Sequence, residues 1–249
     1  MHPTTLIITC ALVGLFALPS HADIAADIQA AMASEIRSDA DKARDSNRKP
    51  LETLTFFGLR QDMRVLELLP GGGWYTKLLA PVLAKEGKLM VAIGTDGIQK
   101  MVKEGTLPDV EIVSVEQTSF GPGEGGPRYA VEGLKLNASN VDMVLTFRNL
   151  HNFTPDSRAS LNREAFRVLN NGGVYGVVDH TRRHMQSDNS ENWRRMDPVL
   201  MIKEIEAAGF KFIDFSDLHY RYDDELVYEV GRRSVRGNTD RFTLLFKKP

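Results

Sequence analysis

A short apolar run, a glycine turn and a periodic helix follow one another between residues 64 and 84, and this segment constrains the fold most. Residues 64–69 read Arg-Val-Leu-Glu-Leu-Leu, which is typical of a buried strand. Pro70–Gly73 predicts a turn, and Trp74–Ala84 has the apolar spacing of a helix. Strand, glycine turn and helix in this order open a nucleotide-binding βαβ unit. We therefore expect a ligand site where this first strand ends.

Strand-like and helix-like segments alternate along the rest of the chain. Further strands are expected over residues 88–93, 110–115, 141–147, 174–178, 210–215 and 241–246. Helices are expected over residues 155–168 and 198–208, because Thr154-Pro155 and Asp197-Pro198 are typical helix starts. The alternation predicts an α/β fold with a doubly wound, mostly parallel sheet. Since no helix is recognisable between the last two strands, the last strand is expected to be antiparallel.

Two segments outside this alternation complete the predicted fold. Helices over residues 23–47 and 50–57 are expected before the first strand. Residues 119–140 are rich in Gly and Pro, and we expect an irregular flap there.

The N-terminal segment differs in character from everything that follows. Leu6–Leu18 is an uncharged apolar run that leads into Pro19-Ser20-His21-Ala22, a pattern typical of a secretory signal peptide. The run is shorter than the roughly 20 apolar residues that span a membrane. We predict a signal peptide over residues 1–22, cleaved after Ala22, one mature domain over residues 23–249, and a periplasmic or secreted location. No Lys or Arg precedes the run, so a membrane-attached N-terminus is the rival interpretation.

The charge balance and the cysteine content limit which classes of binding partner and which chemistry we expect. The chain has 31 Lys plus Arg against 33 Asp plus Glu, a net charge of -2, which gives no general attraction to nucleic acid or to anionic membranes. Cys10 is the only cysteine, so the mature chain would have neither disulfides nor thiolate chemistry. We expect a small-molecule substrate, no nucleic-acid partner and no stable membrane insertion after signal cleavage. The sequence does not indicate the oligomeric state.

Four segments taken together resemble a known family. They are Val65-Leu66-Glu67 with Pro70–Thr76, Leu145–Asn152, Val178-Asp179-His180, and Arg236–Phe242. The combination is similar to the class I S-adenosylmethionine-dependent methyltransferases, and more narrowly to a bacterial group of exported predicted methyltransferases. The resemblance covers about residues 37–249 and implies a Rossmann-like methyltransferase fold, S-adenosylmethionine as cofactor and methyl transfer as activity. Leu69 stands where the family has the first of its alternating glycines, and Ile93 where an acid usually binds the ribose.

The expected cofactor site combines the glycine turn with two carboxylates. Gly71 and Gly73 would let the backbone approach a ligand that any Cβ would block. The resemblance implies that Glu67 orients the turn and reaches the methionine end, and that Asp96 takes the ribose. The candidate cofactor-binding residues are Glu67, Pro70, Gly71, Gly72, Gly73 and Asp96. A plain tight turn without a ligand is the alternative.

The candidate catalytic residues are Arg148, Asn149 and His151, which leave strand 141–147 at the edge where ligands bind in doubly wound sheets. Methyl transfer needs an aligned acceptor and, where the acceptor is protonated, a base. His151 is expected to be that base, and Arg148 to hold an anionic group of the acceptor. Alternatively, both side chains pin the loop by hydrogen bonds. Asp179 and His180 end the next strand on the same side.

No metal site is predicted. His180 and His184 are four residues apart, but this spacing puts two ligands on one face only in a helix, and here it follows a strand.

Two functions remain open. One is methyl transfer from S-adenosylmethionine to an unidentified small-molecule acceptor. The other is a non-catalytic periplasmic protein that binds a nucleoside or another small ligand on the same fold, an interpretation that Leu69 and Ile93 favour. An NAD-dependent oxidoreductase is disfavoured because no Gly-x-Gly-x-x-Gly follows the first strand.

Overall fold

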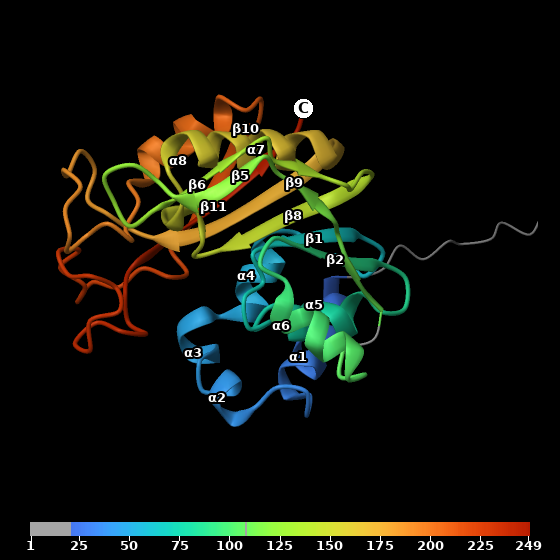
Figure 1. Ribbon diagram of the computed structural model, residues 1–249. Helices are drawn as coiled ribbons and strands as arrows, with labels where there is room; N and C mark the ends of the chain where they lie inside the picture. Colours follow the sequence, from blue (N-terminus) through green and yellow to red (C-terminus); the bar gives the residue numbers. More distant parts are fainter. Residues whose placement is uncertain (1–20, 108) are drawn as a thin grey trace, which may run out of the picture.

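A seven-stranded sheet forms the centre of the molecule (Figure 1). The computed structural model describes residues 21–107 and 109–249. The strand order is β10-β11-β9-β8-β1-β2-β3. The sheet strands are β1 (Arg64–Leu68), β2 (Lys88–Ala92), β3 (Val110–Ile112), β8 (Val141–Phe147), β9 (Leu169–His180), β10 (Lys211–Ser216) and β11 (Arg241–Lys247). Only β11 is antiparallel to its neighbours β9 and β10 among the described strands of this sheet, so the predicted doubly wound sheet with an antiparallel last strand is confirmed.

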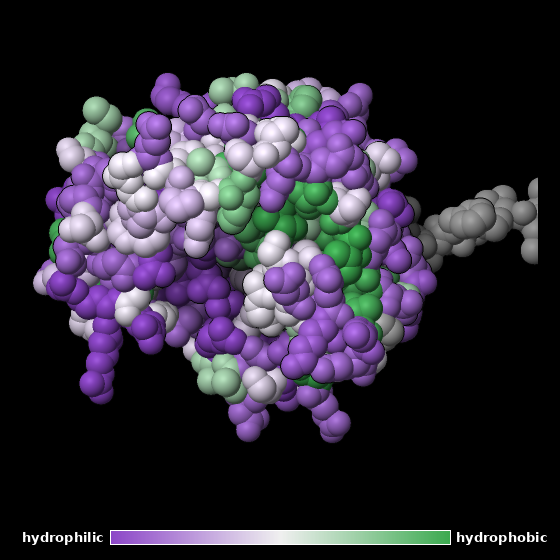
Figure 2. Space-filling model, viewed as in Figure 1, coloured by the Kyte–Doolittle hydropathy of each residue, from purple (hydrophilic) through white to green (hydrophobic). Residues whose placement is uncertain are grey.

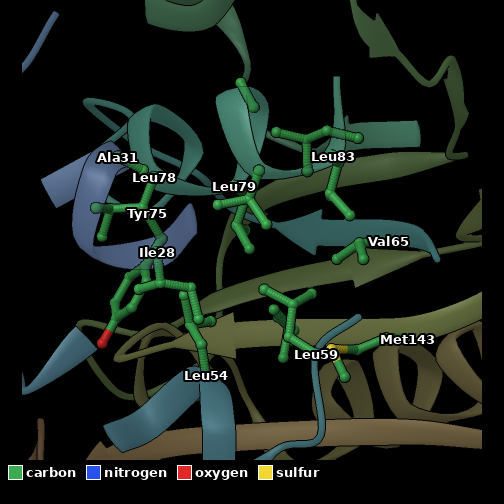
Figure 3. Close-up of a cluster of buried hydrophobic side chains, with 14 of the residues drawn as sticks. Ile28, Ala31, Leu54, Leu59, Val65, Tyr75, Leu78, Leu79, Leu83 and Met143 are labelled. Atoms are coloured by element: carbon green, nitrogen blue, oxygen red, sulfur yellow. The ribbon is translucent and has the colours of Figure 1, made fainter. Parts of the chain in front are cut away.

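Helices cover both faces of the sheet. In Figure 1, α1 (His21–Ala33), α4 (Pro50–Phe56), α5 (Thr76–Leu83) and α6 (Asp96–Lys103) lie below the sheet, whereas α7 (Pro155–Val168) and α8 (Pro198–Glu206) lie above it. Successive strand residues point to opposite faces, so Val65 packs into the lower apolar cluster and Leu66 into the upper one. Figure 3 shows the lower cluster, in which Leu54 and Leu79 from the helices lie against the strands. The result is a three-layer α/β domain.

The helix starts predicted from the sequence are confirmed. The Thr154 hydroxyl accepts a hydrogen bond from Ser157 N, and the Asp197 carboxylate accepts one from Val199 N. Each residue is followed by a proline in the first helical turn, where the missing N–H costs no hydrogen bond.

The N-terminal helix predicted over residues 23–47 is interrupted. α1 ends at Ala33, and two single-turn helices follow, α2 (Asp39–Lys42) and α3 (Asp45–Arg48). Ser38 and Asp41 form a capping box, in which each side chain accepts from the other residue's backbone N–H, and this starts a new helix. Lys49, in the left-handed region at φ 40°, then separates α3 from α4.

The prediction of an irregular flap over residues 119–140 is wrong. β5 (Ser119–Pro122) pairs with β6 (Tyr129–Glu132) in an antiparallel hairpin, and β4 (Val115–Glu116) pairs with β7 (Lys135–Leu136). β4 is also separate from β3, so the strand predicted over residues 110–115 is two short strands. These pairings join residues distant in sequence, which local composition does not reveal.

One further helix and one strand boundary differ from the prediction. The helix α6 was not predicted, because Gly97 and the charged residues in its short sequence mask the apolar spacing of Ile98, Met101 and Val102. β9 begins at Leu169 rather than at residue 174, since a register shift against β8 keeps residues 169–173 in the ladder.

The predicted signal peptide lies outside the described residues, except for His21 and Ala22, which fall in α1. Across the part of the chain that the structure describes, no helix is long and apolar enough to cross a membrane.

Candidate functional site

The crevice at the carboxyl ends of the strands lies where the strand order reverses, between β1 and β8. Three non-glycine residues at this edge have left-handed backbones, namely Leu69 after β1 (φ 56°), Ile93 after β2 (φ 65°) and Arg148 after β8 (φ 61°). This conformation is unfavourable for residues with a Cβ, and above all for β-branched isoleucine. Backbone strain of this kind clusters at ligand sites. Leu69 thus keeps the conformation of a glycine although it has a side chain.

An apolar cavity of about 590 Å³ opens beside Leu69 and Ile93. It is closed by the β3–β4 segment and by the hairpin β5–β6, from which Phe120 and Tyr129 stack at 5.2 Å. Figure 2 shows apolar side chains gathered in a hollow in the middle of this face. The lining residues are Leu69, Ile93, Gly94, Thr95, Asp96, Gln99, Ile112, Val113, Ser114, Val115, Gln117, Phe120, Tyr129, Asn152 and Phe153. Its size and its few polar groups suit a small organic ligand.

Asp96 lies at the rim of the apolar cavity. It is an exposed residue in the first turn of α6. Next to it, Thr95 is buried and its hydroxyl accepts a hydrogen bond from Gln99 Nε2 at 2.9 Å. Asp96, which we expect to bind the ribose, therefore lies at this cavity. Ile93, which lines the same cavity, occupies the position where the family usually has an acid.

The glycine turn has a ligand side and a packing side. A Cβ added to Gly71 or Gly72 would meet no atom within 4 Å, and both residues line a second, polar cavity. A Cβ on Gly73 would lie 2.7 Å from Ile98 Cδ1, and Gly73 is absent from the lining of either cavity. Gly71 and Gly72 therefore suit the predicted close approach of a ligand, whereas Gly73 makes room for α6.

Glu67 lies under the turn and lines the polar cavity. Its side chain is 3% exposed and accepts a hydrogen bond from the Thr76 hydroxyl at 2.6 Å. Burial raises its pKa to about 7, against the opposing effects of Thr76 and Arg48. Glu67 is therefore a buried acid that a cationic ligand group would hold in its charged form.

Arg48 enters the polar cavity from the N-terminal helices. Its guanidinium lies over the indole of Trp74, 4.4 Å from the ring centroid, and is 8% exposed as a residue. The guanidinium makes no hydrogen bond to another residue that the structure describes. Burial and the charge of Arg148 lower the pKa of Arg48 to about 9. A buried guanidinium without an acceptor is suited to an anionic ligand.

Arg148 and Asn149 follow β8 into the same cavity. The Asn149 amide donates to Leu69 O at 3.0 Å and to Phe147 O at 3.1 Å, so it fastens the end of β8 to the end of β1. Arg148 is half-buried beside Tyr75, and burial lowers the pKa of its guanidinium. Asn149 thus has a structural task in the described residues, whereas the Arg148 side chain is left for a ligand.

His151 and Asp179 form a buried pair next to the site, and neither residue lines the apolar or the polar cavity. His151 Nδ1 lies 2.6 Å from Asp179 Oδ1, and His151 N donates to Asp179 Oδ2 at 3.1 Å. An ionised Asp179 places the proton on Nδ1 and leaves Nε2 as the basic atom. Next to this pair, His180 Nδ1 lies 2.8 Å from the Thr239 hydroxyl, and its ring centroid is 5.5 Å from that of His151. Burial and the charges of His151, Arg241 and Arg148 lower the pKa of His180 far below its ordinary value, so its ring is neutral.

Some of the site could not be found from the sequence. Arg48 belongs to a segment with no recognisable motif, and only the tertiary fold brings it to the crevice. The pairing of Asp179 with His151 also depends on the fold, although both were singled out as lying on the correct edge. Trp74 and Tyr75, which follow the turn, serve both as core residues and as walls of the polar cavity. In the described residues, no group of three or more His, Cys, Asp and Glu side chains is arranged to hold a metal ion.

The sequence matches no protein-family model and no curated protein. The fold, however, is similar to those of solved methyltransferases. A S-adenosylmethionine-dependent methyltransferase from Aquifex aeolicus superposes with a TM-score of 0.59 at 15% identity, over 89% of this chain and 97% of that chain. The [4+2]-cyclase SpnF superposes with a TM-score of 0.56 at 17% identity, over 91% of this chain and 93% of that chain. The CcbJ methyltransferase from Streptomyces caelestis superposes with a TM-score of 0.51 at 13% identity, over 82% of this chain and 89% of that chain.

These likenesses show the fold. The chain has the Rossmann-like α/β fold of S-adenosylmethionine-dependent methyltransferases, with its antiparallel C-terminal strand and N-terminal helices. At such low identity the fold does not identify the substrate.

Proposed function

We propose that the protein is a methyltransferase that uses S-adenosylmethionine to methylate a small-molecule acceptor. The observation that carries the proposal is the pairing of an apolar cavity with a polar one on either side of Leu69, at the switch point of a methyltransferase fold. A nucleoside with an amino-acid tail has the same two parts.

The residues present fit this cofactor. The apolar cavity suits the adenine, with Asp96 at its rim for the ribose hydroxyls. In the polar cavity, Glu67 would face the ammonium group and the unpartnered Arg48 guanidinium the carboxylate. The open space above Gly71 and Gly72 admits the chain between these groups. Bound there, S-adenosylmethionine supplies an electrophilic methyl group.

His151 has the arrangement of a general base. Asp179 fixes the ring and its tautomer, so that Nε2 accepts a proton from an acceptor hydroxyl, amine or thiol. Asp179 is a positioning residue, because it acts through His151. Arg148, on the same edge, would orient the acceptor.

Calorimetric titration of the protein with S-adenosylmethionine and S-adenosylhomocysteine tests the cofactor. We expect both compounds to bind. The proposal would be refuted if neither of them binds. An acceptor can then be sought by incubating extracts with labelled S-adenosylmethionine.

With an acceptor in hand, His151→Ala should lower turnover by roughly 10² or more while cofactor affinity is retained. His184→Ala is the matched control, since His184 also pairs with a carboxylate, Asp197 at 2.9 Å, but its side chain is exposed in the loop after β9. Equal turnover in wild type and His151→Ala would remove the base assignment.

A second function is supported by one observation. Leu69 and Ile93 stand at the positions where the family resemblance implies a glycine and an acid that bind the cofactor. A binding protein without turnover would take the cofactor or a related nucleoside tightly, yet transfer label to no compound in any extract.

We also propose that the chain is exported, on the basis of the apolar run and the cleavage pattern before Asp23. N-terminal sequencing of the protein recovered from the periplasm should give Asp23 as the first residue. Protein that retains Met1 and stays in the cytoplasm would contradict export.

A further inference from the structure

Positive charge is concentrated where the polar cavity meets the ends of β8 and β11. Arg48, Arg148 and Arg241 all lie near Tyr75; burial and the charge of Arg148 lower the pKa of both Arg48 and Arg241, and the charge of Arg241 also lowers that of Arg48. Arg241 donates to the carbonyls of Asn47 and Gly237, while its Nε is buried without a partner. Figure 2 shows a recessed, strongly hydrophilic region beside the apolar hollow. Three guanidinium groups therefore share one partly enclosed region.

The carboxylates near this region are already engaged. Asp179 accepts hydrogen bonds from His151 N and His180 N and pairs with the His151 ring. Asp41 forms ion pairs with Arg44 and Lys77. No ion pair joins Arg48, Arg148 or Arg241 to a carboxylate among the residues that the structure describes. The charges of Asp179 and Asp240 act on Arg148 and Arg241 without pairing with them. Buried charges without an ion-pair partner are costly, so an anionic ligand would stabilise this arrangement.

The proposed cofactor does not neutralise the cluster. This step rests on the proposed function, in which one carboxylate of S-adenosylmethionine faces Arg48 and the ammonium faces Glu67. The sulfonium then adds a further positive charge to the crevice. With the cofactor bound, Arg148 and Arg241 still lack an ion-pair partner among the described residues, and Arg148 is the one that lines the cavity.

We infer that the methyl acceptor is an anion, whose carboxylate or phosphate group is bound by Arg148 beside the His151–Asp179 pair. The guanidinium fork of Arg148 matches either group with two parallel hydrogen bonds. Arg241 strengthens the attraction without contacting the acceptor, since its terminal nitrogens donate to carbonyls. Fixing the anionic end of the acceptor leaves its nucleophilic end free to reach His151 Nε2.

The test uses acetate and inorganic phosphate as probes of the two anion classes. Each is titrated, at constant ionic strength, into the full-length protein saturated with S-adenosylhomocysteine. We expect at least one of them to bind in the millimolar range, and to bind several-fold more tightly when S-adenosylmethionine replaces S-adenosylhomocysteine, because the sulfonium adds a charge. The anion that binds identifies the class of acceptor group.

Variants assign the binding to Arg148. R148Q should weaken anion affinity by about tenfold or more, whereas R148K, which keeps the charge but loses the bidentate fork, should retain only part of it. R163Q is the matched control, because Arg163 is exposed on α7. Circular dichroism checks folding first, and R148M replaces R148Q if the latter does not fold.

Three results separate this inference from the proposed function. Anions that compete with S-adenosylhomocysteine, rather than bind beside it, would assign the cluster to the cofactor carboxylate and overturn the inference. Absence of saturable binding by both anions to the cofactor-loaded protein would also overturn it. If S-adenosylhomocysteine itself does not bind, the proposed function fails, whatever the anions do.

Discussion

Arg195 and Arg48 are both buried arginines, and their guanidinium groups have opposite surroundings. Arg195 is fully buried and donates to both oxygens of Asp224, at 2.8 and 3.0 Å, and to the carbonyls of Tyr228 and Thr181. Arg48 lies over an indole in the polar cavity, which Glu67 also lines, and its guanidinium makes no hydrogen bond to a described residue. A folded chain satisfies its structural charges internally, so a buried charge left without a partner indicates a place for a ligand. The loop after β10 is thus held by Arg195, whereas Arg48 is available for binding.

The largest expected effect comes from breaking the satisfied pair. Arg195→Met leaves the Asp224 carboxylate buried without its counter-ion, so the free energy of unfolding should fall by about 3–5 kcal/mol. Denaturant unfolding measures this, with Arg163→Met as the exposed control. The double variant Arg195→Met/Asp224→Leu should recover part of the loss, because no unpaired charge remains. A loss below about 1 kcal/mol in Arg195→Met would remove the contrast with Arg48.

Arg48→Met should have the opposite signature. The free energy of unfolding should stay the same or rise, because the substitution removes a desolvated charge without breaking a hydrogen bond of its guanidinium to a described residue. Affinity for S-adenosylmethionine should fall about tenfold or more, since a charge-assisted hydrogen bond is lost. Denaturant unfolding and calorimetry check the two parts. A large loss of stability with unchanged affinity would make Arg48 a structural residue.

The glycine turn offers the same contrast between packing and binding over two adjacent residues. Gly73→Ala should lower the free energy of unfolding by about 1–3 kcal/mol, because φ is 75° and its Cβ would press on Ile98. Gly72→Ala should fold as well as the wild type and bind S-adenosylmethionine more weakly, since its Cβ points into open cavity space. Thermal unfolding and calorimetry of the two variants are compared directly. Equal behaviour in both assays would contradict the assignment of two sides to the turn.

A pH-dependent effect concerns Glu67, a buried acid with one hydroxyl partner. Its pKa is raised from 4.5 to about 7, so the folded protein binds this proton more strongly than the unfolded chain. The free energy of unfolding therefore falls as the pH rises between these two values. Relative to Glu67→Gln, the wild type should lose about 3 kcal/mol over this window. Parallel pH profiles of the two proteins would contradict the raised pKa.

Local signals in the sequence were sufficient for most of the sheet. Apolar runs such as Val141–Phe147 are buried strands, and Thr154 and Asp197 cap their helices as predicted. The turn at Gly71 and Gly72 was also placed correctly at a cavity. These features depend on residues close together in the chain.

The features that could not be predicted depend on distant residues. The hairpin β5–β6 exists because Phe120 pairs with Val131, and composition there suggested only a loop. Arg48 acquires its place because α3 folds against the indole of Trp74, and no motif surrounds it in the sequence. For the same reason we predicted a binding role for Gly73, whereas its neighbours in space are Ile98 and Met101.

The position of Trp74 also makes it an optical reporter. Its indole lies under the guanidinium groups of Arg48 and Arg37, at 4.4 and 5.0 Å, and borders the polar cavity. A carboxylate that reaches Arg48 changes the electric field across this ring, so intrinsic fluorescence should shift when the cavity fills. The chain has two tryptophans, and Trp193 borders neither the apolar cavity nor the polar one. Replacing Trp193 with Phe would therefore isolate the emission of Trp74 and let ligand entry be followed in real time without a label.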